Sequence, residues 1–236
     1  MAAQLPDGLS ILMPVYNEIE RIERALDETL AVSLPCPFEL VVVDDGSTDG
    51  TVEYLRNRKF PDNVRVHFHQ RNQGKGAAVR TALTDARLRF SAIFDADLEY
   101  DPNDLALLVE PLRDDDAVHV VYGVRKFDGY TSHSFLYVMG NRGVTLAANL
   151  LFNVYIHDLM TCHKAMYTET FRALPLRTKG FSIEPEITAR LLQRGERIYE
   201  VPVSYRARAS EEGKKLTAAD GFRVLWTLLR CRLTRK

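Results

Sequence analysis

Two carboxylates one residue apart, Asp95 and Asp97, are the residues of this sequence best suited to carry out chemistry. They follow residues 91–94, a short apolar run typical of a buried strand. Carboxylates on the loop that leaves a strand can point at one hard cation, and Mg²⁺ and Mn²⁺ prefer oxygen ligands. The spacing therefore predicts a divalent metal site at Asp95 and Asp97, with Glu99 as a third ligand, direct or through water. The alternative interpretation is a solvated acidic turn.

A second acidic pair, Asp44 and Asp45, ends the apolar run of residues 38–43. An ionised Asp only accepts hydrogen bonds, so the pair suits the edge of a uracil or guanine base and the hydroxyls of ribose. The sequence Asp45-Gly46-Ser47 is also typical of a tight turn that caps the next helix. Both interpretations can hold together.

A third polar segment, Pro14-Val15-Tyr16-Asn17-Glu18, follows a predicted strand at residues 9–13. Tyr16 offers a ring for a base to lie against, and Glu18 offers a hydrogen-bond acceptor. Asn17, with Glu20 three residues later, predicts the cap of a helix whose apolar residues are Ile22, Leu26 and Leu30.

The elements that position these side chains are short apolar runs alternating with amphipathic stretches, which is typical of βαβ units. We expect strands at residues 9–13, 38–43, 64–68, 91–94 and 117–122, and a helix at 76–88. Ligands of open parallel sheets bind outside the carboxyl ends of the strands, where both acidic pairs and Arg125 fall. The pattern predicts an α/β fold with a mainly parallel, Rossmann-like sheet flanked by helices.

The pattern changes after residue 130, where we expect a long helix, a strand at 160–167, a helix at 183–193 and a strand at 197–205. No repeat, linker or low-complexity stretch divides the chain. We therefore expect one domain over residues 1–236. It would have one half at 9–125, a second half at 126–215 and a basic amphipathic C-terminal helix at 217–236.

The composition is that of a globular protein, with 236 residues, 46% hydrophobic and 27% charged. The net charge of −1 leaves no strong field for nucleic acid. The three cysteines are widely spaced, which predicts neither a disulfide framework nor a metal-ligand pair and favours a reducing, cytoplasmic setting. Residues 1–10 lack the pattern of a signal peptide. The longest apolar stretch, residues 134–156, contains Arg142 and three asparagines, so we do not expect it to span a membrane.

Four segments together resemble a known family. They are Pro14-Val15-Tyr16-Asn17-Glu18, Val41-Val42-Val43-Asp44-Asp45-Gly46-Ser47, Asn72-Gln73-Gly74-Lys75-Gly76 and Asp95-Ala96-Asp97-Leu98-Glu99. Their order and spacing resemble the family 2 glycosyltransferases of the GT-A (nucleotide-diphospho-sugar transferase) fold. Within that family, residues 9–229 are similar to the branch of dolichol-phosphate mannose synthases and other polyprenyl-phosphate glycosyltransferases.

The resemblance implies that 9–125 is a nucleotide-sugar half and 126–215 an acceptor half, and it implies a role for each matching residue. The nucleotide-sugar pocket would be lined by Pro14, Tyr16, Glu18, Val43, Asp45, Asp95, Ala96 and Asp97. Asp95, Asp97 and Glu99 would hold the Mg²⁺ or Mn²⁺ ion that bridges the diphosphate. The acceptor phosphate would be held by Arg125, Arg142, Arg208 and Lys215, the last in a loop that lacks the family's serine. Residues 158–164 depart from the family's Asp-Pro-Thr-Ser-Gly-Phe-Arg, which predicts an unusual substrate.

The implied reaction is inverting, metal-dependent transfer of a hexose, mannose from GDP-mannose, to a polyprenyl or dolichyl phosphate. The metal ion would neutralise charge on the leaving diphosphate, with Asp97 and Arg125 as catalytic residues. A phosphate monoester has a second pKa of about 6, so it needs arginines to orient it and no general base. Glu184 would be the base for a hydroxyl acceptor, although an acidic residue also simply favours the start of a helix.

The C-terminal residues point to the place of the reaction. Phe222, Leu225, Trp226 and Leu229 fall at helical spacing among basic residues, which is typical of a helix lying on a membrane surface. We therefore expect peripheral attachment to the cytoplasmic face of a membrane. The alternative is a last helix packed on the domain with a basic tail. The state of oligomerisation is left open, with a homo-oligomer as one outcome.

Three rival functions remain. An NAD(P)-binding protein would explain Gly74-x-Gly76 with Asp95 about twenty residues on, but Val79 stands where the fingerprint has its third glycine. A UDP-sugar-dependent glycosyltransferase could act on a hydroxyl group of a soluble saccharide or natural product. A non-catalytic nucleotide-sugar-binding or scaffold protein would not require both Asp95 and Asp97.

Overall fold

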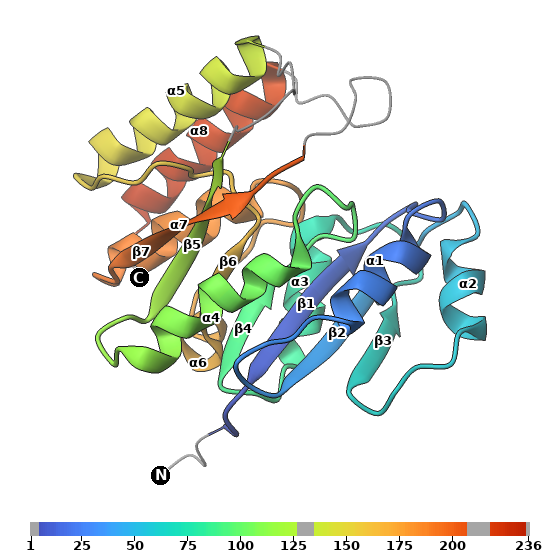
Figure 1. Cartoon of the computed structure of the whole chain (residues 1–236). Helices are drawn as coiled ribbons and strands as arrows, with labels where there is room; N and C mark the ends of the chain where they lie inside the picture. Colours follow the sequence, from blue (N-terminus) through green and yellow to red (C-terminus); the bar gives the residue numbers. More distant parts are fainter. Residues whose placement is uncertain (1–4, 127–134, 207–217, 235–236) are drawn as a thin grey trace.

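The computed structural model describes residues 5–126, 135–206 and 218–234, and its helices and strands alternate along the chain (Figure 1). The strands are β1 (Leu9–Val15), β2 (Phe38–Asp44), β3 (Val64–Phe68), β4 (Phe90–Ile93), β5 (Val120–Lys126), β6 (Lys164–Tyr167) and β7 (Ile198–Ser204). The helices are α1 (Ile22–Leu30), α2 (Thr51–Asn57), α3 (Lys75–Thr84), α4 (Leu105–Asp114), α5 (Phe135–Phe152), α6 (Thr168–Arg172), α7 (Ile183–Gln193) and α8 (Ala218–Leu233), with a short 3-10 helix, η1 (Pro102–Asp104), before α4.

The described strands form one seven-stranded sheet in the order β3-β2-β1-β4-β6-β5-β7. Neighbouring strands are parallel except at β6, which runs antiparallel to both β4 and β5. The carboxyl ends of β1, β2, β4 and β5 therefore share one edge. Because β6 runs the opposite way, its amino end and the residues just before it reach that same edge. The predicted mainly parallel sheet flanked by helices is confirmed.

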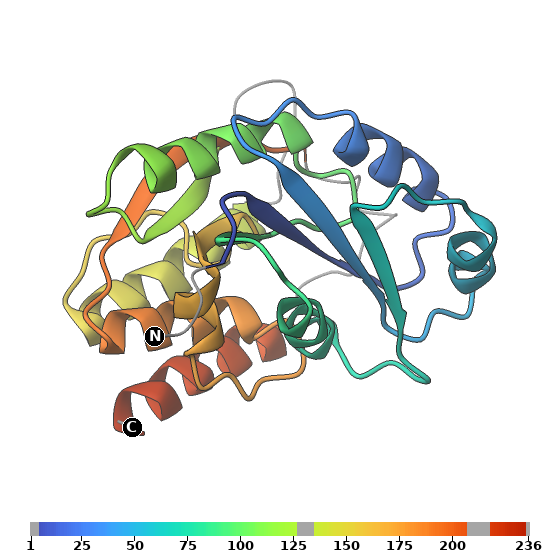
Figure 2. The same cartoon turned by 90° about the horizontal axis from the view of Figure 1, so that it is seen from below.

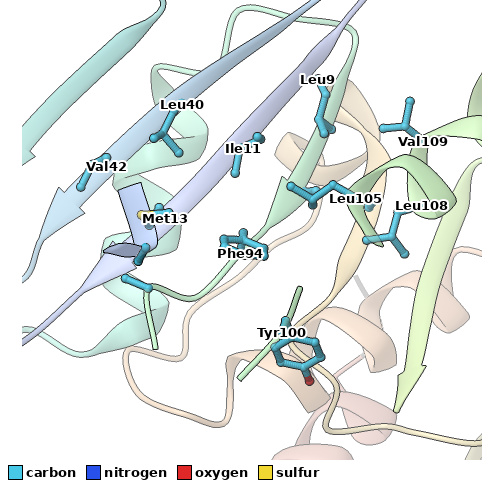
Figure 3. Packing of buried hydrophobic residues seen from close by; sticks show 14 of the residues in the cluster. Leu9, Ile11, Met13, Leu40, Val42, Phe94, Tyr100, Leu105, Leu108 and Val109 are labelled. Carbon is cyan, nitrogen blue, oxygen red and sulfur yellow. The ribbon is translucent and has the colours of Figure 1, made fainter. Parts of the chain in front are cut away.

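Side chains of the strands alternate between two apolar layers. Leu9, Ile11 and Met13 of β1 belong to the apolar cluster with residues of α1 and α4 on one face of the sheet, and Figure 3 shows Leu105 of α4 on this side of β1. Leu12 points to the opposite face, where α3, α6 and α7 cover the sheet. Figure 2 shows helices on both sides of the strands. This alternation follows from the two-residue period of a strand, and it makes every residue of the central strands part of a core.

Two long helices form a further layer outside α7. Helices α5 and α8 lie side by side and pack on α7 through a small apolar core that includes Val144, Ala148, Leu228 and Cys231 (Figure 1). Helix α5 occupies most of the apolar stretch at residues 134–156. None of the described helices combines the length and hydropathy that a membrane crossing requires.

Three details differ from the sequence prediction. Helix α4 was not predicted; Pro111 lies inside it, and proline is normally unfavourable within a helix. Helix α3 starts at Lys75 and ends at Thr84, earlier than the predicted residue 88. Asn17 does not cap α1, which begins at Ile22 without a side-chain cap. The prediction of a capping box at Asn17 was therefore wrong.

Candidate active site

The loop after β1 is tied to the loop after β2 by hydrogen bonds between backbone and side chains. Asn17 has a left-handed backbone (φ 54°), and its side-chain oxygen accepts from the Thr48 amide at 2.8 Å. The Asn17 amide in turn donates to Ser47 Oγ at 2.9 Å. Asn17 thus joins two loops instead of capping a helix. The crosslink holds the half-exposed Tyr16 at the sheet edge, in the place expected for a residue that stacks on a base.

The two aspartates after β2 are buried and build the surrounding loops. Asp44 Oδ1 accepts from the amides of Gly46 and Ser47 at 3.0 and 2.9 Å, which is the predicted turn chemistry. The carboxylate of Asp45 accepts from the amide of Gly74 at 2.6 Å and from the amide of Gln73 at 3.0 Å. Its use for a base or ribose stays a prediction, while its structural use is to anchor the loop before α3.

The loop before α3 is also fixed by close backbone packing. A Cβ atom on Gly74 would collide with the carbonyl oxygen of Lys179, and one on Gly76 with the carbonyl oxygen of Thr178. Gly74 has a φ of 97°, a conformation that L side chains rarely adopt. Glycine is therefore required on both sides of Lys75. Lys75, the first residue of α3, is thus held in place by the packing of the glycines on both sides of it.

Lys75 lies at the centre of a buried charged cluster. Its Nζ is 2.6 Å from Asp95 Oδ2, 2.7 Å from Glu184 Oε1 and 2.9 Å from Cys162 Sγ. These contacts use the three donors of an ammonium group. Burial disfavours the charge of Asp95, but the adjacent Lys75 outweighs burial and lowers the pKa of this carboxyl. Burial and the Asp95 carboxylate raise the pKa of Cys162 well above its usual value, so Cys162 is a neutral thiol at pH 7.

Asp97 and Glu99 lie on the loop that follows Asp95. Asp97 Oδ1 accepts from the Glu99 amide at 3.1 Å, while the Glu99 side chain accepts from the Tyr205 hydroxyl at 2.9 Å. Glu99 also lines a cavity of about 340 Å³ between α1, η1 and the end of β7, together with Arg24 and Arg206.

Asp95 and Asp97 have the donor chemistry of magnesium or manganese ligands, and their joint binding of an ion stays a prediction. Among the described residues, no three His, Cys, Asp or Glu side chains converge so as to hold an ion. The predicted three-carboxylate set that includes Glu99 is therefore not assembled in this arrangement. Asp95 already binds a cationic group, the ammonium of Lys75. Mg²⁺ is commonly bound by one or two carboxylates plus substrate phosphates and water, which Asp95 and Asp97 can provide.

Arg125, at the end of β5, makes a buried ion pair with Asp158. Its Nε and one terminal nitrogen lie 2.6 and 2.8 Å from the two carboxylate oxygens, and its guanidinium stacks 5.0 Å from the centre of the Tyr205 ring. Burial opposes ionisation of Asp158, but Arg125 outweighs it and lowers the pKa of this carboxyl. Arg125 thus reaches the predicted edge, but this side of its guanidinium is already bound to a carboxylate.

The other predicted phosphate ligands are placed differently. Arg142 is exposed on α5, whereas Arg208 and Lys215 lie outside the described residues. Glu184 is the second residue of α7, as the helix-start interpretation predicts, and it is buried at the cluster; its role as a base stays a prediction. Its Oε1 contacts Lys75, and its Oε2 is buried without a hydrogen-bond partner in the described chain.

The unusual segment at residues 158–164 supplies several of these contacts. Cys162 faces Lys75, and His163 stacks on Tyr100 with 4.1 Å between ring centres. Burial lowers the pKa of His163 to about 3, so its imidazole is neutral at pH 7. Lys164 donates to the carbonyl oxygens of Leu159 and Thr161, and burial lowers its pKa to about 8. The segment reaches the active-site edge because β6 is antiparallel.

Sequence reasoning assigned no role to Lys75, Asp158 or Cys162. A signal was present only for Lys75, a lysine between two glycines at the expected start of a helix. Asp158 and Cys162 find their partners 33 and 87 residues away in the sequence, so the register of β6 was needed to bring them there.

The fold and this edge of acidic residues define a nucleotide-sugar-dependent glycosyltransferase. The chain belongs to glycosyl transferase family 2, whose model matches residues 10–174.

Among curated proteins, the chain is 30% identical over 207 residues to glycosyltransferase AglJ of Haloferax volcanii, covering 85% of this chain and 63% of that protein. It is 28% identical to an undecaprenyl-phosphate mannosyltransferase of Micrococcus luteus, covering 86% of this chain and 85% of the relative. It is 27% identical to a polyprenol monophosphomannose synthase of Mycolicibacterium smegmatis, covering 84% of this chain and 77% of the relative. The chain thus spans less than two thirds of AglJ and 85% of the Micrococcus protein.

Among solved structures, the chain resembles glucosyl-3-phosphoglycerate synthase of Mycobacterium tuberculosis, crystallised with Mn²⁺, UDP and glucosyl-3-phosphoglycerate. The TM-score is 0.74 at 21% identity, covering 98% of this chain and 81% of the other. At this identity the likeness establishes the GT-A fold.

Proposed function

We propose that the protein transfers a hexose, mannose from GDP-mannose, to a polyprenyl or dolichyl phosphate at a membrane surface, with inversion at the anomeric carbon. Two relatives that match most of the chain are named for transfer of mannose to polyprenyl phosphates. The observation on this molecule that carries the proposal is the pair of exposed apolar stripes on α5 and α8, two helices that pack on each other and on α7.

Each of these two helices leaves an apolar stripe in solvent. On α8 the stripe consists of Phe222, Trp226, Leu229 and Leu233, with spacings of four, three and four residues that place them on one face. On α5 it consists of Phe135, Met139, Leu146 and Leu150. Arg142 lies within the α5 stripe, and Arg223 and Arg232 flank the α8 stripe. Apolar faces bordered by arginines suit the boundary between lipid headgroups and acyl chains.

The divalent ion, bound by Asp95 and Asp97, would neutralise charge on the leaving diphosphate. We propose that Tyr16 and Asp45, with the residues around them, hold the nucleotide, as the family resemblance implies. The acceptor phosphate is largely dianionic at neutral pH and can attack without a general base. Arg142 and Arg208 are our candidates for orienting it. Arg125 would contribute a phosphate contact only if its pair with Asp158 opened.

An acceptor screen tests the proposal. Purified protein with Mn²⁺ is given GDP-mannose, UDP-glucose or UDP-N-acetylglucosamine, and released nucleotide is measured with a short polyprenyl phosphate, the matching polyprenol, or neither. We expect release above background only with the polyprenyl phosphate, and most with GDP-mannose. Transfer to the polyprenol or to a soluble sugar, with none to the phosphate, would contradict the proposed acceptor.

One observation favours the second candidate function, transfer from a UDP-sugar to a hydroxyl group. Glu184 Oε2 is buried at the cluster without a hydrogen-bond partner among the described residues, and a carboxylate so placed could accept the proton of a hydroxyl acceptor. Glu184→Gln distinguishes the two functions. It would remove nearly all transfer to a hydroxyl group by loss of the base, whereas transfer to a phosphate would lose less because no base is needed.

Membrane attachment is tested by flotation with vesicles that contain anionic phospholipid. The double variant Phe222→Ser/Trp226→Ser should lose most binding, because these side chains are 73% and 66% exposed on the α8 stripe. Tyr199→Ser is the matched control, since Tyr199 is an exposed aromatic residue on β7 outside both stripes. Equal binding by the stripe variant and the control would contradict a membrane role for α8.

A further inference from the structure

We propose that Lys75 is the resident cation of Asp95 and gives up this carboxylate when the divalent ion binds, moving fully onto Glu184. Lys75 would thus be a positioning residue that keeps the metal site closed until donor and metal are present together. The inference rests on the proposed metal-dependent transfer, and the experiment below separates failure of the one from failure of the other.

The first observation is the sharing of the Lys75 ammonium between two carboxylates on different elements. Asp95 follows β4 and Glu184 opens α7, and their oxygens lie 2.6 and 2.7 Å from Nζ. An ammonium bound by one carboxylate alone would have to enter water or stay buried without a partner once that carboxylate was taken by a metal ion. Lys75 has a second carboxylate already in contact, so it can leave Asp95 without losing its ionic partner.

The second observation is the unused capacity of Glu184. Its Oε1 contacts Lys75, but its Oε2 is buried with no hydrogen-bond partner among the described residues. A buried carboxylate oxygen without a partner is costly, because no hydrogen bond replaces its lost hydration. When Lys75 leaves Asp95, one of its N–H groups becomes available to this oxygen. Metal binding would thereby give Glu184 Oε2 the hydrogen-bond partner that it lacks in the metal-free state.

The third observation is the balance of charge at the edge. Asp95 and Glu184 bring two negative charges to the single positive charge of Lys75, and the buried Lys164 also interacts with Glu184. The ammonium beside Asp95 repels a divalent ion, and a donor diphosphate, by adding negative charge, would favour the ion over the ammonium at this carboxylate.

The backbone around Lys75 is anchored, so only the side chain of Lys75 would have to move. The amide of Gly74 is held by Asp45 at 2.6 Å, and Gly74 and Gly76 pack directly on the carbonyl groups of Lys179 and Thr178. The start of α3 is therefore anchored on both sides of Lys75. A lysine side chain is long and flexible enough to change between neighbouring partners without a change in the helix.

The test is Mn²⁺ binding measured by electron paramagnetic resonance, first without nucleotide and then with GDP or UDP. Without nucleotide, we expect Lys75→Met to bind Mn²⁺ at least ~10-fold more tightly than the wild type, because no ammonium competes for Asp95. Glu184→Gln should bind Mn²⁺ more weakly than the wild type, because Lys75 then has only Asp95 as an ionic partner. Lys59→Met, which removes an exposed lysine before β3, is the control for net charge and should match the wild type.

Lys75→Met leaves two carboxylates without their cation and could unfold, so a second comparison is needed. The double variant Lys75→Met/Glu184→Gln removes one of these carboxylate charges and should bind Mn²⁺ more tightly than Glu184→Gln alone. If wild type binds Mn²⁺ with nucleotide but neither comparison shows tighter binding on removal of Lys75, the inference is overturned and the proposed function stands. If no variant binds Mn²⁺ even with nucleotide, the metal-dependent function itself fails, and the inference fails with it.

Discussion

Two buried groups of charged residues lie at the same sheet edge, and they differ in how well positive and negative charges are matched. Arg125 and Asp158 form a one-to-one bidentate pair, each side chain 4% exposed. Lys75 instead divides one ammonium between Asp95 and Glu184, which leaves negative charge in excess. A balanced pair needs no further ion, whereas an unbalanced cluster is suited to accept a cation. The first pair therefore stabilises the fold, and we propose that the second cluster takes part in metal binding.

The largest effect on stability should come from breaking the balanced pair. Arg125→Met leaves Asp158 buried without its cation and should lower the free energy of unfolding by about 3–5 kcal/mol. The double variant Arg125→Met/Asp158→Leu, which removes both charges, should lose much less. Urea denaturation at pH 7 measures both. A double variant as unstable as the single one would mean that the pair's packing matters more than its charge.

The next effect concerns activity alone. Asp97→Asn should lower the rate of transfer by about 10²–10³-fold, because one ligand of the ion that stabilises the leaving diphosphate loses its charge. Its urea midpoint should stay near that of the wild type, since the Asn side-chain oxygen can still accept from the Glu99 amide. Turnover at the wild-type rate would contradict a role in metal binding.

A smaller effect should follow from moving the backbone beneath Lys75. Gly76→Ala places a methyl group against the Thr178 carbonyl and should cost about 1–3 kcal/mol of stability, as overpacking does. It should also weaken Mn²⁺-dependent nucleotide binding. Gly180→Ala is the matched control, because a Cβ atom there meets nothing within 4 Å. Similar losses in both variants would show that the segment at 178–180, and not the contact with Gly76, is sensitive.

The smallest effect is the pH dependence of the balanced pair. The pKa of Asp158 is lower in the folded protein than its usual value, so its stabilising contribution is complete above pH ~4. It is lost as the pH falls through the folded pKa. The difference in unfolding free energy between wild type and Asp158→Asn should therefore be constant from pH 6 to 8 and shrink in acid. A difference that grew in acid would contradict the ion pair.

The position of the acidic residues could be predicted from sequence, but the partners that bind them could not. The buried run before Asp95 and the alternation of strands and helices place the carboxylates at the carboxyl edge of the sheet, because parallel strands leave no other choice. The partners of Lys75 and Arg125 could not be predicted. Asp158 and Cys162 lie in the segment before β6, and no local pattern reports that β6 inserts antiparallel between β4 and β5. Glu184 opens a helix that lies far from Lys75 in the sequence.

Local chemistry also misled in one place. Asn17 and Glu20 match a capping box, yet the Asn17 side chain accepts from Thr48, in the loop after β2. A contact between two loops at the active-site edge prevailed over the local preference. Arg208 and Lys215 lie outside the described residues, so their part in binding phosphate stays a prediction.

The central claim is that Asp95 and Asp97 together hold a divalent ion and the donor's diphosphate. Calorimetric titration of GDP and UDP into the wild-type protein, with Mn²⁺ and then with EDTA, tests it most directly. We expect Mn²⁺ to tighten the binding of at least one nucleotide by ~10-fold or more, and this gain to disappear in Asp97→Asn. Equal affinities in Mn²⁺ and EDTA would contradict the claim.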